Sequence, residues 1–219
     1  MGSNADLLIA MPCRGEIRAV VFSELVSCLL HGAMYWAARF PGSGYRFQTF
    51  TRAHVVEVRN AAVEIARGEN FEWVLWLDDD MAPGHDLLER LHATGKEFVG
   101  AVAYKRLPPY EPCVGRIVEG KMEYWDPDPD LPLARVDLTG FACVLTRRTV
   151  LDAVYEATDG QPFQMRGAMA EDAFFCHQAR KLGIPIHVVP SLVVGHAGDI
   201  VVGREHRVAA LATQSAKRS

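Results

Sequence analysis

The chain has 219 residues, 49 % of them hydrophobic, and a formal net charge of −4. This length suits one domain with a sizeable core, and the acidic balance gives no electrostatic footprint for nucleic acid. No apolar run reaches the ~18 residues of a membrane span, and the start of the chain lacks the pattern of a secretory signal. The five cysteines are scattered and contain no Cys-x-x-Cys pair, which favours reduced thiols in the cytoplasm over disulfides or a zinc site.

The first third of the chain alternates predicted strands and helices. A short apolar run at 7–12 predicts a strand, and apolar residues near helical spacing predict a helix over 18–40. After a Pro- and Gly-rich break, 45–50 predicts a second strand and 54–67 a second helix with one apolar stripe. A third strand follows, and this alternation indicates a parallel, Rossmann-like sheet whose ligand lies beyond the carboxyl ends of the strands.

The third strand, at 71–77, ends abruptly in Asp78, Asp79 and Asp80. Two like charges ~4 Å apart repel by roughly 4 kcal/mol at an effective dielectric near 20, so a buried strand with three acids at its end needs a compensating group. A divalent cation would compensate them, and carboxylate oxygens are the ligands that Mg²⁺ and Mn²⁺ prefer. In an extended chain Asp78 and Asp80 point the same way, which predicts Asp78-x-Asp80 as the working pair. The alternative is a solvated acidic turn, and the buried strand before the pair favours the metal site.

The remaining elements are predicted from the same signals. A helix at 86–94 and a strand at 98–102 precede a proline-containing region with a hairpin near residue 120. A second Asp-x-Asp stretch at 126–130 follows no buried strand, and we interpret it as a solvated loop. We then expect strands at 134–138 and 141–146, a helix at 149–157, a Gly-rich candidate lid at 159–168, a helix at 171–182, and strands at 186–189 and 192–195 that lead to His196.

Several motifs occur in a fixed order along the chain. They are Ile9-Ala10-Met11-Pro12, Arg59-Asn60, the run from Leu75 to Met81, Val99-Gly100-Ala101-Val102, Thr139-Gly140-Phe141, the run from Glu171 to Cys176, and Gly195-His196. Each motif alone is weak, but the ordered set resembles glycosyltransferases of the GT-A fold, close to the family 2-like enzymes of bacteria and phages. The resemblance covers roughly residues 7 to 198.

This resemblance implies a fold, a domain organisation and a donor. The fold would be α/β and Rossmann-like, with a mostly parallel central sheet flanked by helices and a smaller sheet and loop region on the acceptor side. We expect one catalytic domain over 1–199, with a nucleotide-binding half at 5–103 and an acceptor half at 104–199. Residues 200–219 would form a tail that is partly helical and then disordered. The donor would be a nucleotide-diphosphate sugar, with UDP or GDP as the expected nucleotide, and the metal Mn²⁺ or Mg²⁺.

The resemblance also assigns roles to individual residues. Asp78 would lie near the ribose and the metal, Asp80 would be the principal metal ligand, and His196 would close the metal site. Asp172, or else Glu171, resembles the general base of inverting members, although Ala168-Met169-Ala170 replaces the glycine usual before this acidic pair. The nucleotide would contact Pro12, Arg14, Arg59 and Asp79, and the acceptor would contact Lys105, Thr139 and Gly140.

Three functions follow as hypotheses. The first is a glycosyltransferase whose acceptor is a glycan, a lipid-linked sugar, a protein, a small molecule or a modified nucleobase. The second is a nucleotidyltransferase acting on a sugar phosphate, for which Cys13-Arg14-Gly15 is a poor version of the usual phosphate loop. The third is a non-catalytic nucleotide-sugar or carbohydrate binder. The sequence leaves the sugar, the stereochemical outcome and the oligomeric state open.

Overall fold

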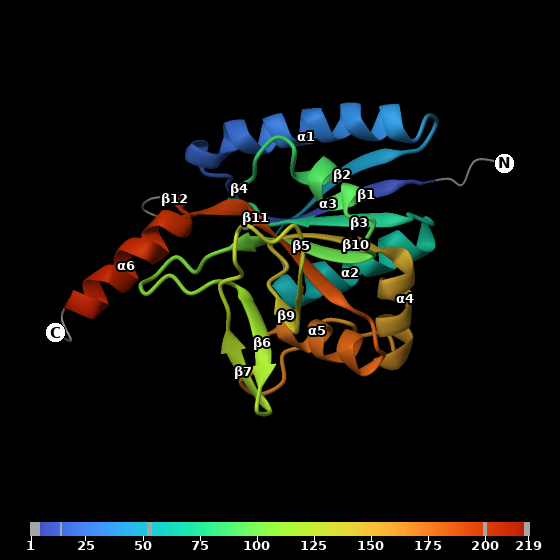
Figure 1. Ribbon diagram of the computed structural model, residues 1–219. Helices are drawn as coiled ribbons and strands as arrows, with labels where there is room; N and C mark the ends of the chain where they lie inside the picture. Colours follow the sequence, from blue (N-terminus) through green and yellow to red (C-terminus); the bar gives the residue numbers. More distant parts are fainter. Residues whose placement is uncertain (1–4, 14, 52–53, 199–200, 217–219) are drawn as a thin grey trace.

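The computed structural model describes residues 5–13, 15–51, 54–198 and 201–216 (Figure 1). The first half of the chain shows the predicted alternation of strands and helices. Its elements are β1 (Leu7–Cys13), α1 (Ala19–Arg39), β2 (Tyr45–Thr51), α2 (Val55–Gly68), β3 (Trp73–Leu77), β4 (Met81–Ala82), α3 (Leu87–Ala93) and β5 (Phe98–Ala103).

The second half adds a hairpin, three helices and the strands that complete the main sheet. Its elements are β6 (Val114–Val118), β7 (Lys121–Tyr124), β8 (Ala134–Val136), β9 (Leu138–Thr139), β10 (Cys143–Arg147), α4 (Arg148–Ala157), α5 (Glu171–Lys181), β11 (Ile186–Ala197), β12 (Val201–Val202) and α6 (Arg204–Ala216). The two strands predicted at 186–189 and 192–195 are one strand, β11. Its register against β5 shifts between Val189 and Val193, because Pro190 lacks the N–H that would continue the ladder.

The main sheet has the strand order β12-β11-β5-β10-β3-β1-β2, and β4 and β8 also pair with β11. β1 runs parallel to β2 and β3, and β11 runs parallel to β5. β10 lies between β3 and β5 and runs antiparallel to both, so these two strands point the same way. The strands β1, β2, β3, β5 and β11 therefore all point the same way. In this sense the sheet is mostly parallel, which confirms the predicted fold class.

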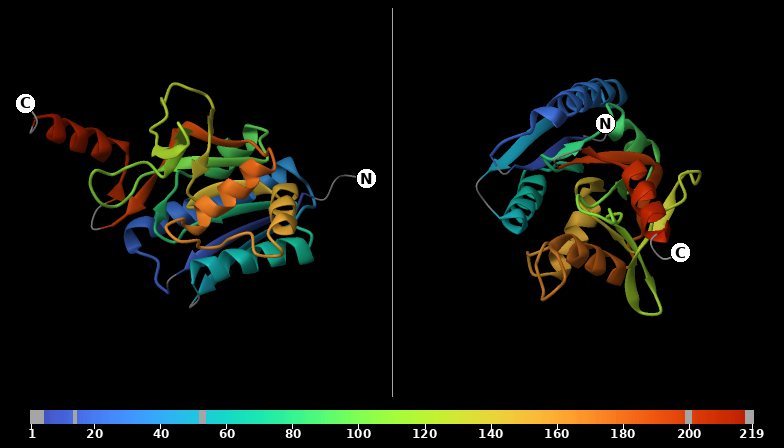
Figure 2. Two further views of the ribbon diagram at one scale, coloured as in Figure 1. Left: turned by 90° about the horizontal axis from the view of Figure 1, so that it is seen from below. Right: turned by 90° about the vertical axis from the view of Figure 1, so that its left-hand side faces the viewer.

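Helices cover both faces of this sheet, as the right-hand view of Figure 2 shows. Successive residues of β1 point to opposite faces: Leu7 and Ile9 pack with α1 and α3, whereas Leu8 and Ala10 pack with α2, α4 and α5. A separate sheet has the order β7-β6-β9: its β6–β7 hairpin projects below the main body in Figure 1, whereas β9 is buried. Helix α6 extends away from the main body and has no buried residue. The molecule thus has three layers, with the carboxyl ends of the parallel strands at one edge.

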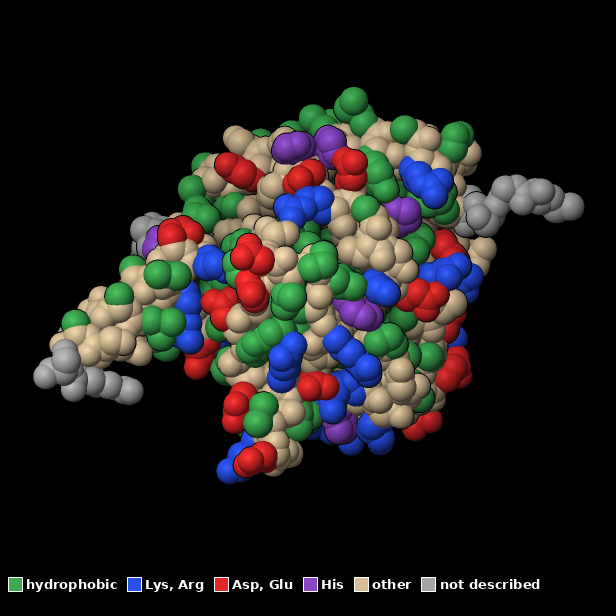
Figure 3. Space-filling view, viewed as in Figure 1, with side chains coloured by type: hydrophobic (Ala, Val, Ile, Leu, Met, Phe, Trp, Pro, Cys, Tyr) green, Lys and Arg blue, Asp and Glu red, His purple; other side chains and the backbone are tan. Residues whose placement is uncertain are grey.

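By length and composition, α1 is the one helix among the described residues that could cross a membrane. It has 21 residues, and 28 % of its most apolar window is buried inside the protein. Its inner face, with Leu25 and Trp36, is buried against the sheet. Leu30 and Met34 of the same helix lie exposed. Hydrophobic side chains are visible along the upper edge of Figure 3, where Figure 1 places α1. A single such helix is weak evidence for a span, since core helices meet the same criterion.

Candidate active site

A cavity of about 480 Å³ lies at the carboxyl ends of β1, β3 and β5. It brings together residues predicted from distant parts of the chain. The predicted residues in its lining are Pro12, Arg59, Asp78, Asp79, Asp80, Gly140, Glu171, Asp172 and His196. Lys105 and Thr139 are not in the lining, and Arg14 lies outside the described residues.

The chain turns directly after β3, so the extended geometry assumed for Asp78-x-Asp80 is wrong. The Met81 N–H donates to the Asp78 carbonyl at 3.3 Å, and the Asp78 N–H donates to the Ala142 carbonyl of the neighbouring segment at 2.9 Å. The turn brings all three carboxylates to the cavity in place of an alternating pair. Asp79 lies beside the Cys13 thiol, whose pKa is raised chiefly by burial and also by this carboxylate.

His196 reaches Asp80 because β4, two residues long, pairs antiparallel with the end of β11 and places Met81 opposite His196. The Ala197 N–H donates to the Asp80 carbonyl at 2.8 Å, and His196 Nε2 lies 3.4 Å from Asp80 Oδ2. His196 Nδ1 lies 2.8 Å from the Tyr104 carbonyl. Because a carbonyl only accepts, Nδ1 donates to it, which leaves Nε2 directed toward Asp80 and the cavity. This is the usual arrangement of metal-binding histidines.

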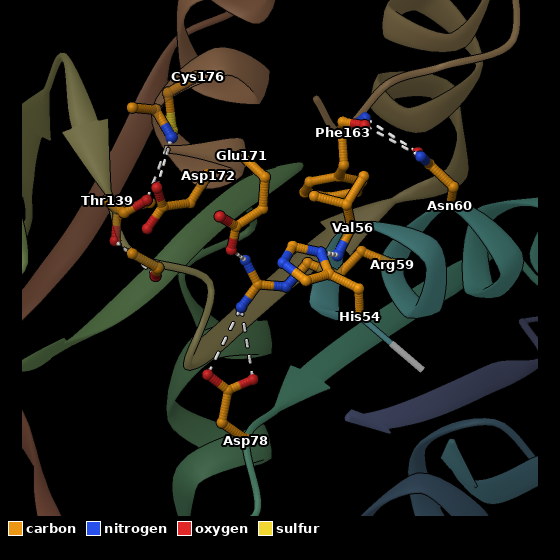
Figure 4. Close-up of polar contacts among 12 residues, drawn as sticks. His54, Val56, Arg59, Asn60, Asp78, Thr139, Phe163, Glu171, Asp172 and Cys176 are labelled. Atoms are coloured by element: carbon orange, nitrogen blue, oxygen red, sulfur yellow. Dashed lines mark hydrogen bonds and ion pairs between the residues drawn. The ribbon is translucent and has the colours of Figure 1, made fainter. Parts of the chain in front are cut away.

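Arg59 joins α2 to two of the acids (Figure 4). Its side chain is 4 % exposed, with Nη1 2.6 Å from Glu171 Oε1 and Nη2 3.4 Å from Asp78 Oδ1. A buried guanidinium requires such partners, since an unpaired buried charge costs several kcal/mol. In the described structure, Arg59 therefore holds Glu171 and Asp78 in place, and its guanidinium also lies over the Phe141 ring at 5.5 Å.

The two candidate bases differ in their surroundings. Glu171 is paired with Arg59, whereas Asp172 Oδ1 accepts a hydrogen bond from the Ala173 N–H at 2.6 Å. Burial raises the pKa of the Asp172 carboxyl, and the nearby Arg59 opposes that rise. A Cβ added at Gly140 would lie 3.6 Å from Asp172 Oδ2 and 3.1 Å from the Cys113 Cβ, so glycine leaves room beside this carboxylate.

Burial also raises the pKa of Asp78, to about 6, with Arg59 opposing the rise and Asp80 adding to it. The Asp78 side chain keeps 26 % of its surface exposed, toward the cavity. Among the described residues, no three His, Cys, Asp or Glu side chains lie close enough to hold a metal ion as they stand. The donor types nevertheless suit Mn²⁺ or Mg²⁺, because they are carboxylates and an imidazole whose second nitrogen is anchored.

Arg106 and His54 line the cavity, although neither is among the site residues predicted from the sequence. Arg106 Nη1 lies 3.5 Å from Asp80 Oδ2, so a guanidinium faces the acid predicted to bind the metal. The preceding Lys105 points away from it, to Glu111 at 2.7 Å and over the Tyr124 ring at 3.7 Å. A charged pair directly after a strand was the available signal, but the sequence does not reveal which of two adjacent residues faces the cavity.

Two further predictions are corrected by burial. Thr139 is fully buried and does not line the cavity, whereas Gly140, the other residue predicted beside it, does. The predicted lid at 159–168 is anchored at its centre, because Phe163 is fully buried and exchanges two hydrogen bonds of 2.9 Å with the Asn60 side chain (Figure 4). The second Asp-x-Asp stretch lies outside the cavity, and its Asp126 accepts a hydrogen bond from the Tyr104 hydroxyl at 2.8 Å.

The sequence matches no family model and no curated protein. Among solved structures, A197 from STIV is similar with a TM-score of 0.57 and 17 % identity, over 92 % of this chain and 91 % of that one. GalNAc-T7 with UDP, GalNAc and Mn²⁺ has a TM-score of 0.57 and 9 % identity, over 94 % of this chain and 47 % of that one. Apo UDP-glucose pyrophosphorylase has a TM-score of 0.51 and 8 % identity, over 98 % of this chain and 99 % of that one. At these identities the likeness shows the fold alone, and the chemistry rests on the cavity.

Proposed function

We propose that this chain is a metal-dependent glycosyltransferase that moves a sugar from a nucleotide-diphosphate sugar to an acceptor hydroxyl. The observation that carries the proposal is the convergence of Asp78, Asp80 and His196 with Asp172 in one cavity at the carboxyl ends of parallel strands. The fold likeness to a protein solved with UDP, GalNAc and Mn²⁺ supports it. The nucleotide is UDP or GDP, and the single catalytic domain extends over 1–199, with the donor half at 5–103 and the acceptor half at 104–199.

Asp78, Asp80 and His196 would hold Mn²⁺ or Mg²⁺. Such an ion, when bound, stabilises the negative charge that develops on the departing diphosphate. Pro12, Asp79 and Arg59 line the cavity beside these acids and would contact the nucleotide. Arg106, whose guanidinium lies 3.5 Å from Asp80, would supply a further positive charge to the diphosphate.

Asp172 is the residue we assign as the base. Its carboxylate accepts the proton of the acceptor hydroxyl while the acceptor oxygen bonds to the sugar C1. The bond between C1 and the diphosphate oxygen breaks, and its electron pair leaves with the diphosphate. A pKa raised by burial brings the carboxyl closer to the working pH, where general bases are most effective. Glu171 serves as a positioning residue through its ion pair with Arg59.

The experiment that tests this function is the substitution Asp80→Ala, with UDP and GDP binding measured by calorimetry with and without Mn²⁺. We expect the Mn²⁺-dependent part of the binding to disappear. Asp130→Ala is the matched control, because Asp130 belongs to the second Asp-x-Asp stretch and is exposed outside the cavity. Unchanged Mn²⁺-dependent binding in Asp80→Ala, or an equal loss in both variants, would refute the proposed site.

The runner-up is a nucleotidyltransferase, which the fold likeness to UDP-glucose pyrophosphorylase over 98 % of this chain favours. Incubation with a nucleoside triphosphate and a sugar phosphate would then release pyrophosphate. Slow Mn²⁺-dependent hydrolysis of a sugar donor would count against the third hypothesis, a binder without turnover.

All five cysteines are free, which suits the proposed location in the reducing cytoplasm.

A further inference from the structure

A second cavity, of about 700 Å³, adjoins the first and shares Cys113 and Asp172 with it. It lies between the β6–β7 hairpin and the start of α5, on the acceptor side of the molecule. Its volume is within the range of about 300–1,000 Å³ typical of small-molecule sites. Because Asp172 lines both cavities, a ligand in the second cavity could present a group to this carboxylate beside the donor.

One wall of this second cavity, which we call the groove, is the apolar face of the β6–β7 hairpin. Since β6 and β7 are antiparallel, Ile117 lies opposite Met122, and Tyr124 lies two residues further along the same face. These three side chains line the groove and keep 37 %, 46 % and 48 % of their surface exposed. A Cβ at Gly115 would meet the Met122 sulfur at 2.8 Å, so the glycine lets Met122 lie across the hairpin.

The opposite wall is also apolar and adaptable. It consists of Met169, which is 37 % exposed, with Ala168, Ala170 and Ala173 around it. Methionine is flexible and polarizable, so a groove with Met122 and Met169 on facing walls adapts to apolar ligands of different shapes. Large apolar side chains are exposed together around this groove, which adjoins a cavity lined by acidic residues. Such a cluster of exposed apolar side chains indicates a binding surface.

The lysine and the arginine that line the groove are each paired with a carboxylate of the protein. Lys105 Nζ lies 2.7 Å from Glu111 Oε2, and Arg180 Nε lies 2.7 Å from Asp137 Oδ1. These cations are therefore engaged, which disfavours a phosphate-rich or nucleic-acid ligand. The Lys105 ammonium also lies over the Tyr124 ring at 3.7 Å and covers a face on which a sugar ring would otherwise stack.

We propose that the acceptor is a hydroxyl compound with an uncharged apolar body, alkyl or aryl, which lies in this groove with its hydroxyl at Asp172. The inference rests on the proposed glycosyl transfer and names its acceptor class. The apolar walls bind the body of the acceptor, and the shared carboxylate meets its oxygen at the junction with the donor cavity.

The test compares n-octyl β-D-glucoside with methyl β-D-glucoside, which carry the same sugar hydroxyls and differ in the apolar body. Affinities are measured by ligand-observed NMR in the presence of Mn²⁺ and UDP, below the micelle concentration. Each buried methylene strengthens binding about fourfold, so burial of three raises the octyl affinity by about 60-fold over methyl. Equal affinities for the two probes would overturn the inference.

Two groove variants and one control locate the effect. Met122→Gln and Met169→Gln keep the side-chain length and should each lower the octyl-to-methyl ratio by about fourfold or more, as the loss of one buried apolar contact predicts. Val118→Gln is the matched control, because Val118 is 45 % exposed on the opposite face of the same hairpin. An equal loss in the control would overturn the assignment to the groove.

Titration of UDP and GDP with Mn²⁺ in the same proteins separates this inference from the proposed function. Nucleotide binding that is equal in wild type and the groove variants, with an octyl preference lost only in those variants, supports the acceptor assignment. Nucleotide binding without any octyl preference overturns the assignment and leaves the proposed function intact. An octyl preference without nucleotide binding overturns both, because the groove would then have no donor beside it.

Discussion

Replacing Arg59 by methionine tests the electrostatic design of the site. The change removes the guanidinium that lies 2.6 Å from Glu171 and 3.4 Å from Asp78, on a side chain only 4 % exposed. Breaking a buried ion pair by removal of one partner costs about 3–5 kcal/mol, because the remaining charge is left uncompensated. We therefore expect Arg59→Met to lower the free energy of unfolding by about this amount at pH 8.

The loss should depend on pH in a definite direction. Burial raises the pKa of Asp78 to about 6 although Arg59 opposes the rise, so the folded state binds this proton more tightly than the unfolded chain. Stability linked to Asp78 is therefore present at low pH and is lost as the pH rises from about 4, the unfolded pKa, through the folded value. Without Arg59 the folded pKa is higher still, so the destabilisation should be larger at pH 8 than at pH 5.

Urea unfolding of the wild type and Arg59→Met at pH 5 and pH 8 measures both effects. Arg67→Met is the control, because Arg67 is on the same helix and pairs with Asp152 and Glu156 while 26 % exposed. An ion pair as exposed as this is worth about 1 kcal/mol or less. A loss in Arg59→Met no larger than that of the control, or one equal at both pH values, would refute the reasoning.

Two further predictions concern the reaction. Asp172→Asn should lower kcat by about 100- to 10,000-fold, the usual contribution of a general base. Mn²⁺-dependent nucleotide binding, measured by calorimetry, should stay at the wild-type level. A larger loss of kcat in Glu171→Gln would contradict the assignment of the base. The wild-type kcat should fall as the pH is lowered from neutral to acid, because only the ionised form of Asp172 accepts a proton. Burial raises the pKa of Asp172, so this fall should occur above the ordinary pKa range of aspartate. A kcat independent of pH would speak against this role.

The sequence predicted those parts of the molecule that follow from local periodicity. Alternating apolar segments located the strands and helices of the first half, and the abrupt end of β3 identified the acids of the cavity. The late His196 was connected with these acids only through the family resemblance, whereas the structure explains the connection by the pairing of β4 with β11.

What the sequence did not reveal depends on pairing and burial between distant segments. β10 enters between β3 and β5 in the opposite direction, a choice that no local pattern encodes. Arg106, rather than Lys105, faces Asp80 because the chain direction after β5 decides which of two neighbours meets the cavity. Phe163 sits in the aromatic core, its ring centroid 5.0 Å from that of Phe141, which a Gly-rich loop pattern conceals.

The central claim is that Asp78, Asp80 and His196 hold a metal ion that binds the diphosphate of the donor. The most direct measurement is a manganese anomalous difference map from a crystal soaked with MnCl₂ and UDP. We predict one strong peak in the cavity within bonding distance of Asp80, with the diphosphate beside it. A map with no peak in the cavity, or with manganese only at surface acids, would contradict the account.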